Sequence, residues 1–386
     1  MSRVLSKVVI CSVFLVTAML YGMAAHKFKL CPYHLLKQLY SGFEARMNSE
    51  QVNEPELPKV YYETPKEYFE TDPAQIISIS RPHDIQRSRD TLISLLWGDS
   101  TLPKQLPSEV TKNFHDDRCK EFASLSRIDR IVVDMEFGIQ SVVYHFLPIK
   151  PNHEIVIYHQ GHSGDFFRSK DQINALLDSG YSVAAFCMPL IGMNNKPTVN
   201  LPGLGTLRLT RHDHFKLLNP EDGHPVKYFI EPVIAVINYL EKKHNISSVS
   251  MIGISGGGWT TTLAAALDTR IKMSFPVAGS LPLYLRNDSD WGDYEQTAPQ
   301  IYRAVNYLEM YIMGSYGQGR MQVQILNQFD TCCFYGTKSE TYKEIVKEKV
   351  KSLGAGGFDL FLDDSHKEHK ISERAIGHIL NILSAE

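Results

Sequence analysis

The residues best suited to chemistry in this chain surround Ser255, which lies in a Gly-x-Ser-x-Gly motif. The apolar run 249–254 is typical of a buried strand, and the small residues 258–267 predict a helix. A serine at so sharp a strand-to-helix turn needs neighbours without side chains, which Gly253 and Gly257 provide. The turn would expose the Ser255 hydroxyl, and the helix would offer free amide donors to a developing oxyanion. The motif therefore predicts a nucleophilic serine, although a glycine-rich turn without chemistry fits the same letters.

In its setting of strand, turn and helix, this motif resembles the nucleophile elbow of the α/β-hydrolase superfamily of serine esterases, lipases and peptidases. The resemblance covers about residues 128–386. It implies an α/β-hydrolase fold, with a mostly parallel central sheet flanked by helices. It also implies a serine assisted by a histidine and an acid, because a hydroxyl needs an imidazole to take its proton and a carboxylate to orient that imidazole.

The resemblance further implies that the acid and then the histidine follow the serine, each in a loop after a strand. Asp330 ends the predicted strand that begins at Gln322, and it takes the acid's position. A solvated loop aspartate is the alternative interpretation of Asp330. Asp359, Asp363 and Asp364 are weaker candidates because they lie in or beside the last strand.

Two histidines remain open as the base. His366 lies four residues after Leu362, a strand-to-histidine distance typical of this fold, which slightly favours it. His369 comes just before the last predicted helix, another position typical of such histidines. One of them would be the base, and the other an ordinary loop histidine.

The resemblance places the oxyanion hole between the backbone amides of Gly256 and His162. His162 follows Gln160-Gly161, where many relatives have His-Gly, and Gly164 would allow close approach. The glutamine departs from the common pattern but leaves the backbone role intact. A glycine turn after a strand is the alternative interpretation.

Alternating strands and helices are expected around these residues. The predicted strands cover 130–136, 141–149, 154–161, 181–189, 249–254, 272–279, 322–330 and 358–362. The predicted helices cover 84–97, 165–179, 232–243 with Pro232 in the first turn, 258–267, 299–313, 339–353 and a last helix capped by Ser372. The alternation predicts a mostly parallel sheet with helices on both faces. Insertions at about 194–225 and 281–319 are predicted to form lids or pocket walls.

The amino-terminal part lies outside the resemblance. Residues 8–25 form an uncharged apolar run preceded by Arg3 and Lys7, so 1–25 is expected to be a signal anchor or a signal peptide. The length of the run favours an uncleaved single-pass membrane anchor, with the catalytic domain on the extracytoplasmic or luminal side. Residues 26–127 are expected to form a linker and an extension that packs on the hydrolase domain, 128–386.

Composition excludes several classes of function. A formal net charge of −3 with no basic stripe gives no footprint for nucleic acid. The 6 cysteines make no disulfide framework, and the adjacent Cys332 and Cys333 are not expected to bond to each other. No cofactor and no metal are expected, because His366 and His369 lack a suitable third zinc ligand nearby.

The leading hypothesis is a serine hydrolase that cleaves a small-molecule or lipid-like carboxylic ester through an acyl-enzyme. A peptidase or an acyltransferase could use the same residues. A non-catalytic binding module on a hydrolase fold is the alternative from another class.

Overall fold

The computed structural model describes residues 64–385 apart from 245, 247, 288 and 289. The expected anchor at 8–25 lies outside these residues. Among the residues that are described, no helix combines the length and the apolar character needed to cross a bilayer.

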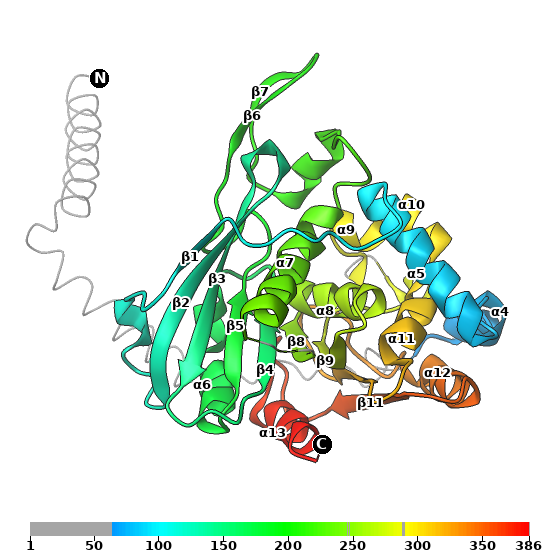
Figure 1. The fold of residues 1–386 in the computed structure, drawn as a ribbon. Helices are drawn as coiled ribbons and strands as arrows, with labels where there is room; N and C mark the ends of the chain where they lie inside the picture. The colour runs from blue at the N-terminus through cyan, green and yellow to red at the C-terminus, as the bar shows by residue number, and fades with distance from the viewer. Residues whose placement is uncertain (1–63, 245, 247, 288–289, 386) are drawn as a thin grey trace, which may run out of the picture. The chain divides into compact units, whose positions relative to one another are not determined.

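A nine-stranded sheet forms the centre of the described chain (Figure 1). Its strands are β1 (Glu109–Thr111), β2 (Leu125–Asp134), β3 (Gln140–Pro148), β4 (Ile155–His159), β5 (Ser182–Phe186), β8 (Val249–Ile254), β9 (Ile271–Val277), β10 (Met321–Asn327) and β11 (Gly357–Asp363). Their order across the sheet is β1-β2-β3-β5-β4-β8-β9-β10-β11. The pairs from β1 to β5 are antiparallel, and every pair from β5 to β11 is parallel. The predicted mostly parallel sheet is therefore confirmed.

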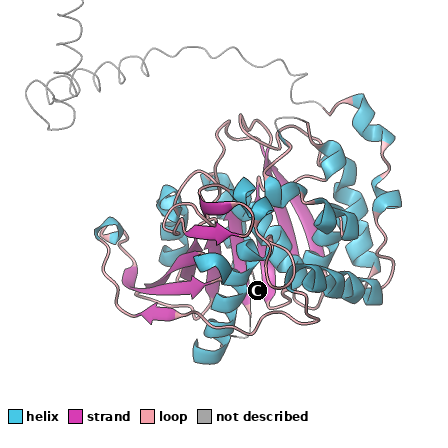
Figure 2. Cartoon of the chain, turned by 90° about the horizontal axis from the view of Figure 1, so that it is seen from above, coloured by secondary structure: helices cyan, strands magenta, loops and turns pink. Residues whose placement is uncertain are grey.

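Helices cover both faces of the sheet (Figure 2). One face carries α6 (Lys170–Asp178) and α13 (Glu373–Leu383), whose apolar residues share a core with Val156 and Tyr158 of β4. A second core, on the opposite face of the sheet, contains Ile155 and Ile157 of β4, because successive side chains of a strand point to opposite faces. It includes residues from α5 (Pro82–Trp97), α7 (Lys227–His244), α8 (Gly256–Leu267), α11 (Tyr307–Ser315) and α12 (Glu340–Ser352). With both faces covered, β4 has no exposed residue, which explains its continuous apolar sequence.

The shorter elements lie in the connections and in the insertions. They are η1 (Lys66–Glu70), α4 (Pro73–Ile76), η2 (Asp117–Cys119), η3 (Glu136–Gly138), η4 (Phe166–Ser169), β6 (Thr198–Leu201), β7 (Gly205–Arg208), η5 (His212–Leu217), η6 (Leu283–Leu285), α9 (Tyr294–Thr297) and α10 (Pro299–Ala304). The insertion at 194–225 thus contains the β6–β7 hairpin and η5, and the insertion at 281–319 contains η6 and three helices.

Three predicted helices differ from those observed. The helix expected at 165–179 begins as the 3₁₀ turn η4 and continues as α6. The single helix expected at 299–313 is divided between α10 and α11, because Asn306 caps α11. Its side chain accepts from the Glu309 amide, and the Glu309 side chain accepts from the Asn306 amide. Pro232 was expected in the first turn of its helix but lies inside α7. Burial of Tyr228 and its apolar neighbours explains this difference, since packing extends the helix upstream of the proline.

Glu231 on α7 carries a prediction about stability. Burial raises the pKa of its carboxyl to about 7, and the charge of Lys227 counters that rise only in part. The pKa of Glu231 is higher in the folded protein than in the unfolded chain. The stability that Glu231 contributes is therefore complete below the unfolded pKa, and it is lost as pH rises through about 7. Through Glu231, the free energy of unfolding of the wild type should fall by up to about 3 kcal/mol between pH 4.5 and 7.5. Glu231→Gln should remove this part of the pH dependence.

Urea denaturation at several pH values would measure the change. Glu241→Gln is the matched control, because Glu241 lies on the same helix and its side chain is exposed beside Arg270. An unchanged pH slope in Glu231→Gln would contradict the prediction.

Candidate active site

Ser255 occupies the turn between β8 and α8. Its backbone has φ 56° and ψ −125°, a conformation that is costly for any residue with a side chain and that is found at functional turns. The Ser255 amide donates to the Val277 carbonyl at 2.9 Å, which holds the turn against β9. A Cβ atom added to Gly253 would lie 2.1 Å from the Gly257 carbonyl oxygen, so glycine is required where β8 and α8 meet. The Ser255 side chain makes no capping hydrogen bond to α8.

Asp330 lies just beyond β10 and is completely buried. Its Oδ1 accepts from the Cys332 and Cys333 amides at 2.7 and 3.2 Å. Its Oδ2 accepts from Asn327 Nδ2 at 3.2 Å and from a histidine described below. These donors satisfy a buried carboxylate without a cation. Cys332 and Cys333 form a disulfide with each other, contrary to expectation, in the tight turn that wraps around this carboxylate.

His369 contacts Asp330 directly. Its Nδ1–H donates to Asp330 Oδ2 at 2.7 Å, which leaves the lone pair on Nε2. Nε2 is buried and has no hydrogen-bond partner among the described residues. Two further bonds join the loops that carry the pair: Thr331 N donates to the Lys367 carbonyl at 3.1 Å, and Asn327 Nδ2 donates to the Lys370 carbonyl at 3.0 Å. The bond to Asp330 thus fixes the tautomer in which Nε2 is free to accept a proton.

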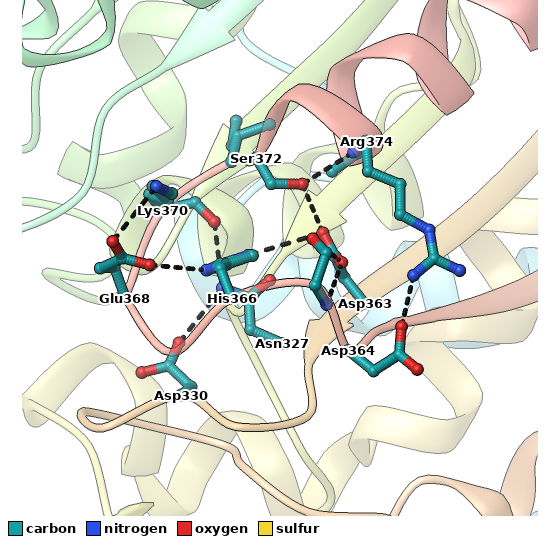
Figure 3. A network of polar contacts seen from close by, with 12 residues as sticks. Asn327, Asp330, Asp363, Asp364, His366, Glu368, Lys370, Ser372 and Arg374 are labelled. Carbon is teal, nitrogen blue, oxygen red and sulfur yellow. Dashed lines mark hydrogen bonds and ion pairs between the residues drawn. The ribbon is translucent and has the colours of Figure 1, made fainter. Parts of the chain in front are cut away.

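His366 lies in the same loop but faces other groups (Figure 3). Its Nε2 is 3.5 Å from Asp363 Oδ2, and its Nδ1 is 3.6 Å from Glu368 Oε2. Neither ring nitrogen makes a hydrogen bond within the described residues. Of the two histidines that the sequence left open, the structure therefore places His369, and not the slightly favoured His366, against Asp330.

The weaker acid candidates are engaged elsewhere. Asp363 accepts hydrogen bonds from Ser365 Oγ at 2.6 Å and from Ser372 Oγ. Asp364 pairs with Arg374 at the start of α13, and Asp359 pairs with Lys347 of α12. Serine hydroxyls and exposed cations are typical partners of structural carboxylates, and none of these contacts orients His369.

The register of the sheet brings the three segments to one edge. Ile254 pairs with Val277, and Val277 pairs with Ile325, so β8, β9 and β10 end at the same level. Asn327 pairs with Asp363 at the end of β11. Because all these strands are parallel, the loops bearing Ser255, Asp330 and His369 leave the sheet at its carboxyl edge, where α/β sheets hold their sites.

The loop after β4 lies against the elbow. A Cβ atom added to Gly161 would lie 2.6 Å from Ser255 Cβ and 3.2 Å from Ser255 Oγ. One added to Gly256 would lie 2.4 Å from His162 Cε1. Gln160 turns inward, and its Oε1 accepts from Ser169 Oγ at 2.9 Å. The two expected oxyanion donors, Gly256 and His162, therefore belong to segments in close contact beside Ser255.

The side chain of His162 meets two acids that sequence analysis did not identify. His162 Nε2 lies 2.9 Å from both Asp293 Oδ2 and Glu295 Oε1. Burial alone would lower the pKa of His162, but the bonds to Asp293 and Glu295 outweigh it and raise the pKa to about 9. His212 of η5 completes the group, with its Nδ1 3.3 Å from Glu295 Oε2. The sequence identified both insertions as walls but contained no signal for this pairing.

Glu295 is held in place by an aromatic chain from α8. Trp259 Nε1 donates to Tyr302 OH at 2.6 Å, and Tyr302 OH donates to the Glu295 carbonyl at 2.8 Å. Tyr307 OH donates to the next carbonyl, that of Gln296, at 2.8 Å. The insertion that contains α9 is thereby fixed to the helix that follows Ser255.

A hollow of about 590 Å³ lies at the opposite edge of the sheet. Its lining includes Glu154, Ser182 and Val249, at or next to the starts of β4, β5 and β8. None of the residues predicted to be catalytic lines this hollow. Sites in this class of fold lie at the carboxyl edge of the sheet, whereas the hollow lies at the edge where the strands begin.

No family model and no curated protein matches the chain. Solved structures do resemble it. Acetyl xylan esterase from Paenibacillus sp. R4 is 16% identical with a TM-score of 0.52, and the match covers 83% of this chain and 98% of that one. Acetyl xylan esterase 1 from Thermoanaerobacterium sp. JW/SL YS485 is 13% identical with a TM-score of 0.53, over the same shares of the two chains, 83% and 98%. Methylesterase BT1017 is 14% identical with a TM-score of 0.55, over 84% of this chain and 69% of that one. Together with the sheet order and the elbow at β8, these likenesses identify the chain as having the α/β-hydrolase fold.

Proposed function

We propose that this protein is a serine hydrolase that cleaves carboxylic esters through an acyl-enzyme. The observation that supports this most strongly is the His369–Asp330 hydrogen bond, made by loops at the same sheet edge as the strained Ser255. The strained backbone of Ser255 and the burial of the Asp330 carboxylate both cost free energy, and a catalytic role would explain why the protein contains both features. His366 would then be a loop histidine.

In the proposed reaction, Ser255 Oγ attacks the ester carbonyl while its proton passes to His369 Nε2. Asp330 stabilises the imidazolium that forms. The Gly256 and His162 amides donate to the oxyanion, with the amino end of α8 adding its dipole. His369 then returns the proton to the leaving alcohol. Water, deprotonated by the same nitrogen, attacks the acyl group and releases the acid.

Esters are preferred over the other substrates of such a site for one reason. The structurally similar proteins with TM-scores above 0.5 are named acetyl xylan esterases and a methylesterase. A small-molecule ester with a short acyl or alkoxy part is therefore the first substrate class to test, and a lipid-like ester is the second. A peptidase or an acyltransferase would use the same three residues. A non-catalytic module would have no use for the strained serine.

Labelling by a fluorophosphonate probe tests the proposal, because only a serine activated by a base reacts with it. The wild-type protein should be labelled at Ser255 and should hydrolyse p-nitrophenyl acetate, with a panel of longer acyl chains locating the preferred length. Absence of both labelling and hydrolysis would favour the binding-module alternative. Labelling without ester hydrolysis would move the function to a peptidase or an acyltransferase.

We further propose that residues 8–25 anchor the protein in a membrane, on the basis of the uncharged run and the basic residues before it. The full chain should remain in the membrane pellet after carbonate washing, with its amino terminus intact. A variant with two apolar residues of this run changed to lysine is the control and should be released. A soluble form that begins near Ala25 would show a cleaved signal peptide instead.

A further inference from the structure

The cluster beside the proposed oxyanion loop combines four side chains from three separate segments. His162 comes from the loop after β4, His212 from η5, and Asp293 and Glu295 from the start of α9. One ligand-type atom from each of the four lies within 4.8 Å of all the others. His212 and Glu295 are buried, whereas the side chain of Asp293 is 57% exposed and faces solvent.

The hydrogen bonds among the described residues leave a carboxylate oxygen of this cluster without a donor. His162 Nε2 can carry only one proton, yet two carboxylate oxygens approach it at 2.9 Å. Glu295 is completely buried, and its Oε2 has no hydrogen-bond partner among the described residues. A buried carboxylate oxygen without a donor is costly and requires an explanation.

His212 presents a lone pair toward that oxygen. Its Nε2–H donates to the Pro189 carbonyl at 2.9 Å, so the neutral ring has its lone pair on Nδ1, which lies 3.3 Å from Glu295 Oε2. A histidine that binds a metal through one ring nitrogen typically donates the N–H of its other ring nitrogen to a carbonyl or carboxylate oxygen. That hydrogen bond fixes the tautomer and the orientation of the ring.

We propose that His162, His212, Asp293 and Glu295 bind a divalent cation of the zinc class. The spacing suits a tetrahedral ion, whose neighbouring ligand atoms lie about 3.3 Å apart when the bonds are about 2.0 Å. In the cluster, His162 Nε2 lies 2.9 Å from the nearest oxygen of each acid, and His212 Nδ1 lies 3.3 Å from Glu295 Oε2. Two imidazoles with two carboxylates favour zinc over calcium or magnesium, which prefer oxygen ligands alone.

The charge balance supports the same assignment. Asp293 and Glu295 bring two negative charges beside imidazoles, and a divalent ion would offset both. Four protein ligands leave no open position, so the ion would be structural and not a Lewis acid in the reaction. It would tie the loop that carries the His162 amide to α9 and to η5, and so stabilise the two insertions around Ser255.

Zinc binding can be measured without any ester substrate. The full chain is stripped with EDTA and titrated with ZnCl₂ by calorimetry, with bound metal counted by mass spectrometry. We expect about one zinc per chain, no comparable binding of Ca²⁺ or Mg²⁺, and a rise in Tm with zinc. Asp293→Asn should weaken zinc binding at least about 100-fold and abolish the rise in Tm, and Glu295→Gln should do the same.

Asp213→Asn is the matched control, because Asp213 lies next to His212 and its carboxylate pairs with exposed Lys216. It should bind zinc as the wild type does. The proposal is overturned if the wild type binds no zinc, or if Asp293→Asn binds it unchanged, which would place the zinc elsewhere. Asp293 is exposed, so this variant should fold even if Glu295→Gln does not. Because the measurement is of metal, its failure leaves the proposed ester hydrolysis untouched.

Discussion

Ser255→Ala should lower the turnover of ester hydrolysis about a million-fold. The loss is this large because the triad acts as a unit, and without the nucleophile no acyl-enzyme can form. The fold should survive the change. Ser255 makes no capping hydrogen bond to α8, and alanine has the same Cβ as serine in the strained backbone.

Steady-state hydrolysis of p-nitrophenyl acetate, together with circular dichroism and Tm, would test this expectation. Ser179→Ala is the matched control, because Ser179 is an exposed serine at the end of α6 whose hydroxyl donates to the Ala175 carbonyl. It should keep full activity. A Ser255→Ala protein that retains more than a few per cent of the wild-type rate would show that another group is the nucleophile.

The second large effect distinguishes the two loop histidines. His369→Gln should reduce turnover nearly as much as Ser255→Ala, because glutamine cannot accept the serine proton although it can still donate to Asp330. His366→Gln should cost less than about tenfold. The His366 ring lies 3.5 Å from Asp363 at the end of β11 and 3.6 Å from Glu368 of its own loop.

The two variants control for each other, since they change the same residue type three positions apart in one loop. The reverse pattern of activities would move the base to His366 and would require the loop to rearrange. Mild losses in both variants would contradict any role for this loop in catalysis. Fluorophosphonate labelling should follow the same order, because it depends on the same activation of Ser255.

Local sequence patterns were sufficient to predict the elements that position the site. The apolar runs of β4 and β8 identify buried parallel strands, since residues covered on both faces need no polar alternation. The elbow at Ser255 is equally local, because a strand, a glycine-flanked serine and a small-residue helix are adjacent in the chain. The split between α10 and α11 is also encoded locally, in the Asn306-x-x-Glu309 capping box that interrupts the helix predicted at 299–313.

Only the tertiary structure decided which side chains meet. His366 and His369 both have plausible positions in the sequence, with a slight preference for His366. The bonds from Thr331 to Lys367 and from Asn327 to Lys370 place His369 on Asp330 instead. His162, His212 and Glu295 are far apart in the chain, and no local pattern links them. Their meeting depends on the packing of two insertions over α8, through contacts such as Trp259 with Tyr302. Loop side chains are placed by such long-range contacts, whereas strands and helices follow the period of their own residues.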